Sequence, residues 1–148
     1  MNAAGLVDDE HCVACGSQAE AGLHMHFAPE GDGVISRLTV SRRFAGWRSI
    51  VHGGAVAMML DEAMAYAAGA RGFVAVTGEL TMRFRRQVLV DAPLAVRGNV
   101  VWQRGDVLGL EASVHDADGT LLARATGRFV RRGTLGPGER FGTMHVGG

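Results

Sequence analysis

The chain has 148 residues, 47% hydrophobic and 20% charged, a composition typical of one soluble globular domain rather than a disordered or fibrous protein. Fifteen basic and fifteen acidic side chains cancel, so no overall charge attracts nucleic acid or an anionic membrane, and we expect neither as a partner. Because the first residues lack the basic start and apolar run of a secretory signal, and no apolar stretch approaches the ~20 residues of a membrane span, we expect a cytoplasmic protein.

The hydrophobic pattern predicts elements in a clear order. Residues 1–21 show no sustained period and are expected to form a flexible arm. In residues 22–40, alternating Leu23, Met25 and Phe27 followed by a Gly-Asp-Gly turn predict a hairpin. The segment from about Gly53 to Gly69 is rich in alanine, methionine and leucine and predicts one long helix. Alternation then predicts four strands, at residues 74–88, 94–103, 108–114 and 121–130. The domain covers residues 22–132, and a glycine-rich tail follows at residues 133–148.

The order of these elements predicts an α+β fold. A single helix between a hairpin and a four-stranded meander has to bury its apolar side against one antiparallel sheet. We therefore expect a long central helix wrapped by a curved sheet of about five to six strands. Because the helix is apolar nearly all round, we also expect a second subunit to cover part of it.

Two adjacent carboxylates, Asp61 and Glu62, interrupt the apolar helix. A carboxylate in such surroundings costs several kcal/mol unless it is paired, hydrogen-bonded or protonated. Either Asp61 serves chemistry, or it caps a neighbouring segment or pairs with an arginine at a dimer contact. Adjacent helix positions point about 100° apart, so the two carboxylates cannot face the same spot.

The sequence His52-Gly53-Gly54 begins the helix. Unpaired N–H groups at a helix start can hold an oxygen that becomes negative, although a glycine pair is equally typical of a sharp entry turn. Gly53 lies eight positions before Asp61, or about 12 Å along a helix, so one reacting carbon cannot touch both. Two antiparallel helices in a two-fold dimer would bring Gly53 of one chain near Asp61 of the other.

The segments VHGGAVAMMLDEAMAYAA and VTGELTMRFRR resemble the PaaI-like hotdog-fold thioesterases. That family carries a His-Gly-Gly and a carboxylate nine positions after the histidine, the spacing of His52 and Asp61, and the resemblance covers about residues 22–131. It implies hydrolysis of an acyl-CoA thioester, with Asp61 as general base or nucleophile and the Gly53 N–H as oxyanion donor. Thr77 would orient water or the carboxylate, or is simply a strand residue. His52 would shape the loop or tune the site.

The resemblance is weaker for substrate binding. Several relatives have Asn or Gln six residues before the histidine, where this chain has Gly46. Trp47 either walls the acyl pocket or covers the core. Coenzyme A phosphates need local cations, but strand-edge arginines such as Arg86, Arg131 and Arg132 are often only solubilising. We assign substrate binding to Trp47, Gly54, Glu62, Arg83 and Arg85.

We predict no metal and no cofactor. Cys12, Cys15, His24 and His26 have the residue types of a metal site but not its usual spacing, and that site stays an alternative. Two other functions also stay open: a hotdog hydratase or dehydratase of acyl thioesters, and a non-catalytic acyl-CoA binding protein. We expect a homo-oligomer, either a dimer or a tetramer.

Overall fold

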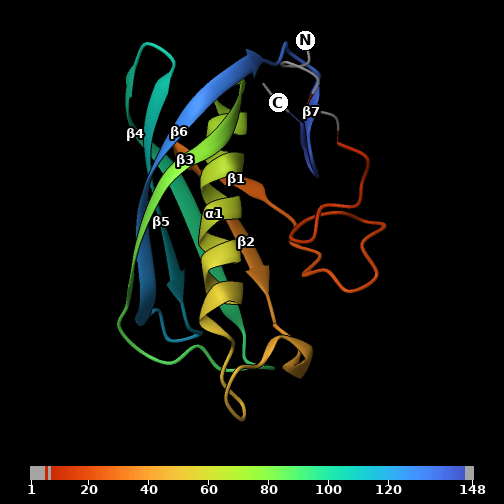
Figure 1. Cartoon of the computed structure of the whole chain (residues 1–148), viewed down its shortest axis with the longest axis vertical. Helices are drawn as coiled ribbons and strands as arrows, with labels where there is room; N and C mark the ends of the chain where they lie inside the picture. Colours follow the sequence, from red (N-terminus) through yellow and green to blue (C-terminus); the bar gives the residue numbers. More distant parts are fainter. Residues whose placement is uncertain (1–5, 7, 146–148) are drawn as a thin grey trace.

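One helix, α1 (Gly53–Ala70), forms the centre of the molecule (Figure 1). The structure is a computed structural model and describes residue 6 and residues 8–145. The helix ends where Gly72 adopts a φ of +83°, close to the predicted end. Within the described residues, no helix is long and apolar enough to cross a membrane.

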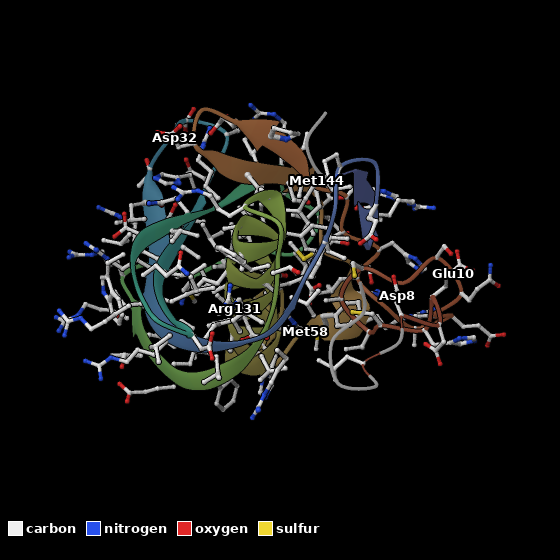
Figure 2. All side chains as sticks on the ribbon, turned by 90° about the horizontal axis from the view of Figure 1, so that it is seen from above. Asp8, Glu10, Asp32, Met58, Arg131 and Met144 are labelled. Atoms are coloured by element: carbon white, nitrogen blue, oxygen red, sulfur yellow. The ribbon has the colours of Figure 1, made fainter. Side chains whose placement is uncertain are left out.

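Six antiparallel strands form one curved sheet in the order β1-β2-β4-β5-β6-β3, and α1 lies in its concave face (Figures 1 and 2). The predicted α+β hotdog arrangement is therefore confirmed. A short 3-10 helix, η1 (Arg42–Phe44), precedes α1, and a separate two-stranded hairpin follows the sheet. The strands are β1 (Ala28–Glu30), β2 (Gly33–Leu38), β3 (Phe73–Phe84), β4 (Leu94–Arg104), β5 (Val107–His115), β6 (Leu121–Thr134), β7 (Arg140–Phe141) and β8 (Met144–His145).

Alternating burial explains how the sheet wraps the helix. Along β6, Ala123, Ala125, Gly127 and Phe129 are buried, and the residues that alternate with them are exposed. Gly98 of β4 lies so close to the helix that a Cβ there would overlap the backbone of Ala63. A larger residue at position 98 would therefore push the helix away from the sheet.

The predicted strand at residues 23–27 is wrong, although its burial pattern is right. Leu23, Met25 and Phe27 are buried and the two histidines between them are exposed, but no sheet ladder forms. The N–H groups of Leu23 and Met25 instead donate to the carbonyls of Val13 and Ala14, and His24 has a φ of +52°. Pairing inside the N-terminal segment, residues 8–27, thus replaces pairing with the sheet.

The N-terminal segment and the β7–β8 hairpin cover the side of α1 that the sheet leaves open (Figures 1 and 2). Tyr66 of the helix stacks on Phe27 with ring centroids 4.3 Å apart and meets the edge of Phe141 at 5.0 Å. Ala14 and Cys15 are buried there. The chain itself therefore covers part of the helix for which we expected a second subunit.

Candidate active site

His52 caps the start of α1. The imidazole Nδ1 of His52 accepts a hydrogen bond from the N–H of Gly54 at 2.8 Å. The backbone N–H of His52 donates to the carbonyl of Phe44 at 2.8 Å. Because Nδ1 is an acceptor, the neutral ring carries its proton on Nε2. His52 thus fixes the loop and uses up the Gly54 N–H, which cannot also bind substrate.

Gly53 lines an open groove at the start of the helix. Among the residues that the structure describes, its N–H has no hydrogen-bond acceptor, and Gly53 is exposed. Trp47, 81% exposed, and Phe84, 51% exposed, lie on the same groove, which has a volume of about 600 Å³. We call it the amide groove; its lining is Gly46, Trp47, Ile50, Val51, His52, Gly53, Val56, Phe84, Arg85, Arg86, Gln87 and Val88.

Asp61 and Thr77 form a hydrogen-bonded pair away from the amide groove. The Thr77 hydroxyl donates to Asp61 Oδ1 at 2.5 Å, and the carboxylate is only half-buried. Thr77 lies on β3, where the register with β6 shifts between Thr77 and Glu79. The contact fixes the carboxylate and leaves it accessible.

The predicted site residues therefore do not all meet within one chain. Trp47, His52, Gly53 and Arg85 share the amide groove, which Asp61 does not line. Arg83 lies outside it as well, while Arg86 lines it beside Arg85. Two further arginines considered for phosphate binding lie elsewhere: Arg131 pairs with Asp106 at 2.7 Å, and Arg132 follows it along β6.

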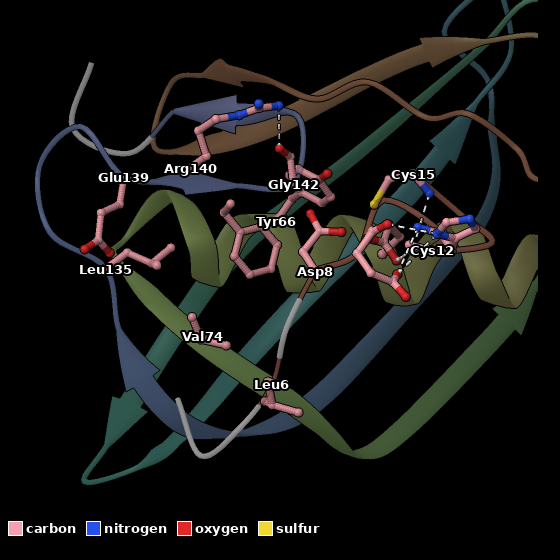
Figure 3. Close-up of a pocket in the computed structure, with 14 residues that line it drawn as sticks. Leu6, Asp8, Cys12, Cys15, Tyr66, Val74, Leu135, Glu139, Arg140 and Gly142 are labelled. Atoms are coloured by element: carbon pink, nitrogen blue, oxygen red, sulfur yellow. Dashed lines mark hydrogen bonds and ion pairs between the residues drawn. The ribbon is translucent and has the colours of Figure 1, made fainter. Parts of the chain in front are cut away.

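Glu62 occupies a third place, beside the cysteines. Cys12 Sγ donates to Glu62 Oε2 at 3.9 Å, and both residues line a cavity of about 860 Å³ together with Tyr66 and Cys15 (Figure 3). Burial raises the pKa of the Glu62 carboxyl, and the charge of Asp61 raises it further. Burial, aided by the Glu62 charge, also raises the pKa of the Cys15 thiol.

The cysteines gather with Glu62 and not with the histidines considered above. His24 and His26 are exposed and belong to no metal-ligating group in the described part of the chain. Helical spacing predicts that Glu62 and Tyr66 share a face of the helix, because they are four positions apart. The sequence carried no sign that Cys12 and Cys15 cover that face.

We expect Glu62→Gln to stabilise the protein in buffer containing a chelator. The folded state holds the Glu62 proton more tightly than the unfolded chain, so stability declines as pH rises above the ordinary carboxyl pKa. Glutamine removes this decline. The melting temperature of the variant should therefore exceed that of the wild type at pH 7, with a smaller difference near pH 4. Equal melting temperatures at both pH values would contradict the assignment of a buried, destabilised charge.

Comparisons with known proteins agree with this architecture. A family model described as the thioesterase superfamily matches residues 49–123. No curated protein matches the chain. Among solved structures, a thioesterase superfamily protein is 23% identical, with a TM-score of 0.71, over 74% of this chain and 57% of the other. This chain thus spans little more than half of that protein.

Two further structures share the fold. The Escherichia coli PaaI protein, from the phenylacetic acid degradation operon, is 21% identical, with a TM-score of 0.70, over 76% of this chain and 83% of its own. A hypothetical thioesterase from Streptococcus pneumoniae, solved with coenzyme A, is 18% identical, with a TM-score of 0.71, over 76% of this chain and 91% of its own. It was also solved with alanine replacing one aspartate and, separately, a threonine sixteen positions later. Since the family model covers half of the sequence, the chain belongs to the thioesterase superfamily.

Proposed function

We propose that this protein hydrolyses an acyl-CoA thioester to the free acid and coenzyme A. The observation that carries the proposal is Asp61, an accessible carboxylate held by Thr77 on a largely apolar helix whose first N–H has no acceptor among the described residues. The sixteen-residue interval between Asp61 and Thr77 equals that between the two residues substituted in the Streptococcus pneumoniae thioesterase. The coenzyme A bound by that protein supports the substrate class.

The geometry supports a general-base mechanism. Asp61 takes a proton from water as the water oxygen bonds to the carbonyl carbon, and the carbonyl oxygen becomes negative against the Gly53 N–H. The intermediate then collapses, the carbon–sulfur bond breaks, and the proton on Asp61 passes to the departing thiolate. Thr77 is a positioning residue, because its hydroxyl holds the Asp61 carboxylate.

Two subunits are needed to assemble this site. One helix face of α1, formed by Ala57, Met58, Asp61 and Ala65, stays half-exposed. Strand β3 is a twelve-residue edge strand that pairs only with β6 in the described chain. A long unpaired edge is a ready partner for a second strand. We infer a two-fold dimer that covers both surfaces.

We infer the register of that dimer from strand geometry. If the two β3 strands pair antiparallel with Thr81 opposite the partner's Thr81, the extra residue at the register shift between Thr77 and Glu79 brings Thr77 opposite the partner's Phe84. Phe84 lies beside Gly53, since a Cβ on Gly53 would be 3.8 Å from its ring. This register therefore brings Asp61 and Thr77 of one subunit to the amide groove of the other.

Arg85 and Arg86 supply the cationic side of the amide groove. The phosphates of coenzyme A are dianionic or anionic groups that guanidinium side chains bind well. The exposed rings of Trp47 and Phe84 offer an apolar surface at the same groove. The groove therefore suits a ligand with an acyl part and a phosphorylated carrier.

A panel of acyl-CoA substrates tests the proposed reaction. We expect release of free thiol, followed with a thiol reagent, from aryl-acetyl, short-chain or medium-chain acyl-CoA. Interconversion of enoyl and hydroxyacyl thioesters without thiol release would instead show a hydratase. Binding of acyl-CoA without any turnover would show a binding protein.

Mixed dimers test the shared site. We expect a purified dimer of one Asp61→Asn chain and one Gly53→Pro chain to keep about half of wild-type activity, because one of its two composite sites is intact. Each variant alone should be nearly inactive. If Asp61 and Gly53 of the same chain formed the site, every site in the mixed dimer would lack one group, and no activity would return.

A further inference from the structure

Two thiols and a carboxylate that the proposed reaction does not use meet at one point. The sulfur atoms of Cys12 and Cys15 and a carboxylate oxygen of Glu62 all lie within 4.8 Å of one another. We call these three residues the thiol–carboxylate cluster. Cys15 is buried and the other two are half-buried, so the cluster is largely shielded from water. Figure 3 shows both cysteines beside α1, on the wall of the large cavity.

The loop that carries the thiols has the build of a ligand loop. The N–H of Cys15 donates to Cys12 Sγ at 3.4 Å, and the N–H of Gly16 donates to the Cys12 carbonyl at 2.7 Å. An N–H directed at sulfur stabilises a thiolate, the form that binds metal. A Cβ at Gly16 would overlap backbone atoms of Glu10 and Cys12, so the tight turn requires glycine.

Within residues 8–145, no cation is paired with the thiol–carboxylate cluster. Among the described residues, Glu62 makes no ion pair with lysine, arginine or histidine. Asp8 and Arg140 line the same cavity, and the Arg140 guanidinium donates to the carbonyl of Gly142 at 2.9 Å rather than to Glu62. A shielded group of acids and thiols without a counter-charge favours binding of a cation.

We propose that Cys12, Cys15 and Glu62 bind one zinc ion. Thiolate ligands exclude calcium and magnesium, which take oxygen ligands, and favour zinc. Zn–S bonds of about 2.3 Å and Zn–O bonds of about 2.1 Å give ligand separations of roughly 3.5–3.8 Å in a tetrahedron. The three atoms therefore need to approach by about 1 Å or less. Each thiol releases its proton to solvent on binding.

The fourth ligand comes from the cavity side. Asp8 and His11 line the cavity next to the cluster. His11 is held at its Nδ1 by the backbone carbonyl of Asp9 at 2.9 Å, which leaves Nε2 as its free nitrogen. Zinc accepts either a carboxylate, an imidazole or water in this position.

Zinc here would fix the N-terminal segment to the helix. Two of its ligands belong to that segment, and the third, Glu62, directly follows Asp61 on α1. The zinc site would thus hold the N-terminal segment against α1 next to the proposed catalytic carboxylate. The proposal replaces the expectation of a metal-free protein, and it is independent of the hydrolysis proposed above.

Metal loading of the reduced, full-length protein tests the site. After addition of Zn²⁺ and gel filtration, we expect about one zinc per chain by elemental analysis. With Co²⁺ as the probe, we expect thiolate-to-cobalt charge-transfer bands in the near ultraviolet and the intense visible bands of tetrahedral cobalt. Sub-stoichiometric zinc together with absence of both sets of bands would overturn the proposal. So would a Cys12–Cys15 disulfide whose reduction does not restore binding.

Variants locate the ligands. Cys12→Ser and Cys15→Ser should each abolish the cobalt charge-transfer bands, while the matched double variant His24→Gln/His26→Gln should bind zinc normally. Glu62→Gln should weaken zinc binding at least tenfold, since even outer-shell changes cost about 10–100-fold. Full binding in the cysteine variants, or loss in the histidine variant, would contradict this ligand set.

Stability provides a readout that does not depend on activity. Zinc at about 100 times its Kd should raise the wild-type Tm by roughly 5–10 °C. The same addition should leave Cys15→Ser unchanged. Should that variant fail to fold, protection of the wild-type thiols from alkylation by zinc gives the same information, and thiols that react equally fast with and without zinc would overturn the proposal.

Discussion

Replacing Asp61 with asparagine is expected to lower kcat by about two orders of magnitude or more, the usual contribution of a general base. Asparagine has nearly the same shape, and its side-chain oxygen can still accept the Thr77 hydroxyl that now binds Asp61 Oδ1 at 2.5 Å. Only the basic group is lost. Since Asp61 acts on water and not on the carrier, we expect KM for the acyl-CoA to change little. Steady-state thiol release measures both constants.

The control for this substitution is Asp32→Asn. Asp32 is an exposed carboxylate in the turn between β1 and β2, well away from the helix (Figure 2). Its replacement removes the same charge without touching the proposed site, so activity should stay at the wild-type level. Near-normal kcat in Asp61→Asn would remove the base from the mechanism and leave the binding-protein hypothesis in its place.

Periodicity was enough to predict the fold. The helix predicted from about Gly53 to Gly69 extends to Ala70, and the four strands that follow it begin and end within a few residues of their expected limits. Each of these elements has a long apolar pattern that its neighbours in the fold reinforce. The predicted hairpin forms around the Gly-Asp-Gly turn as β1 and β2, but residues 23–27 lie outside it. Alternation records burial, and a chain buried against a helix can alternate without forming a sheet.

The candidate site was predictable only in part. Backbone spacing was sufficient to separate Gly53 from Asp61, and the structure keeps them apart within one chain. The boundaries of the arm and tail stay predictions, although β6 extends to Thr134 and a hairpin follows it. The contact between Cys12 and Glu62 joins residues fifty positions apart. No local pattern encodes such a contact, because the path of an irregular segment determines it.

Replacing Gly53 with proline is expected to lower kcat by about 10²–10³-fold, the usual cost of losing one oxyanion donor. Proline removes the N–H and adds a ring, and the first position of a helix is where it fits best. His52 has φ −55° and ψ 137°, the extended conformation that a residue before proline prefers. The helix should therefore remain intact, which circular dichroism and Tm can verify.

Gly53→Ala distinguishes the effect of the N–H from the effect of the free space at position 53. Alanine retains the donor, and its Cβ would lie 3.8 Å from the Phe84 ring, an ordinary contact. We therefore expect Gly53→Ala to keep most of the activity that Gly53→Pro loses. Equal losses in both variants would mean that the space at position 53 matters and its amide does not. Unchanged kcat in Gly53→Pro would show that the negative oxygen is stabilised elsewhere, and the inferred register of the dimer would lose its functional basis.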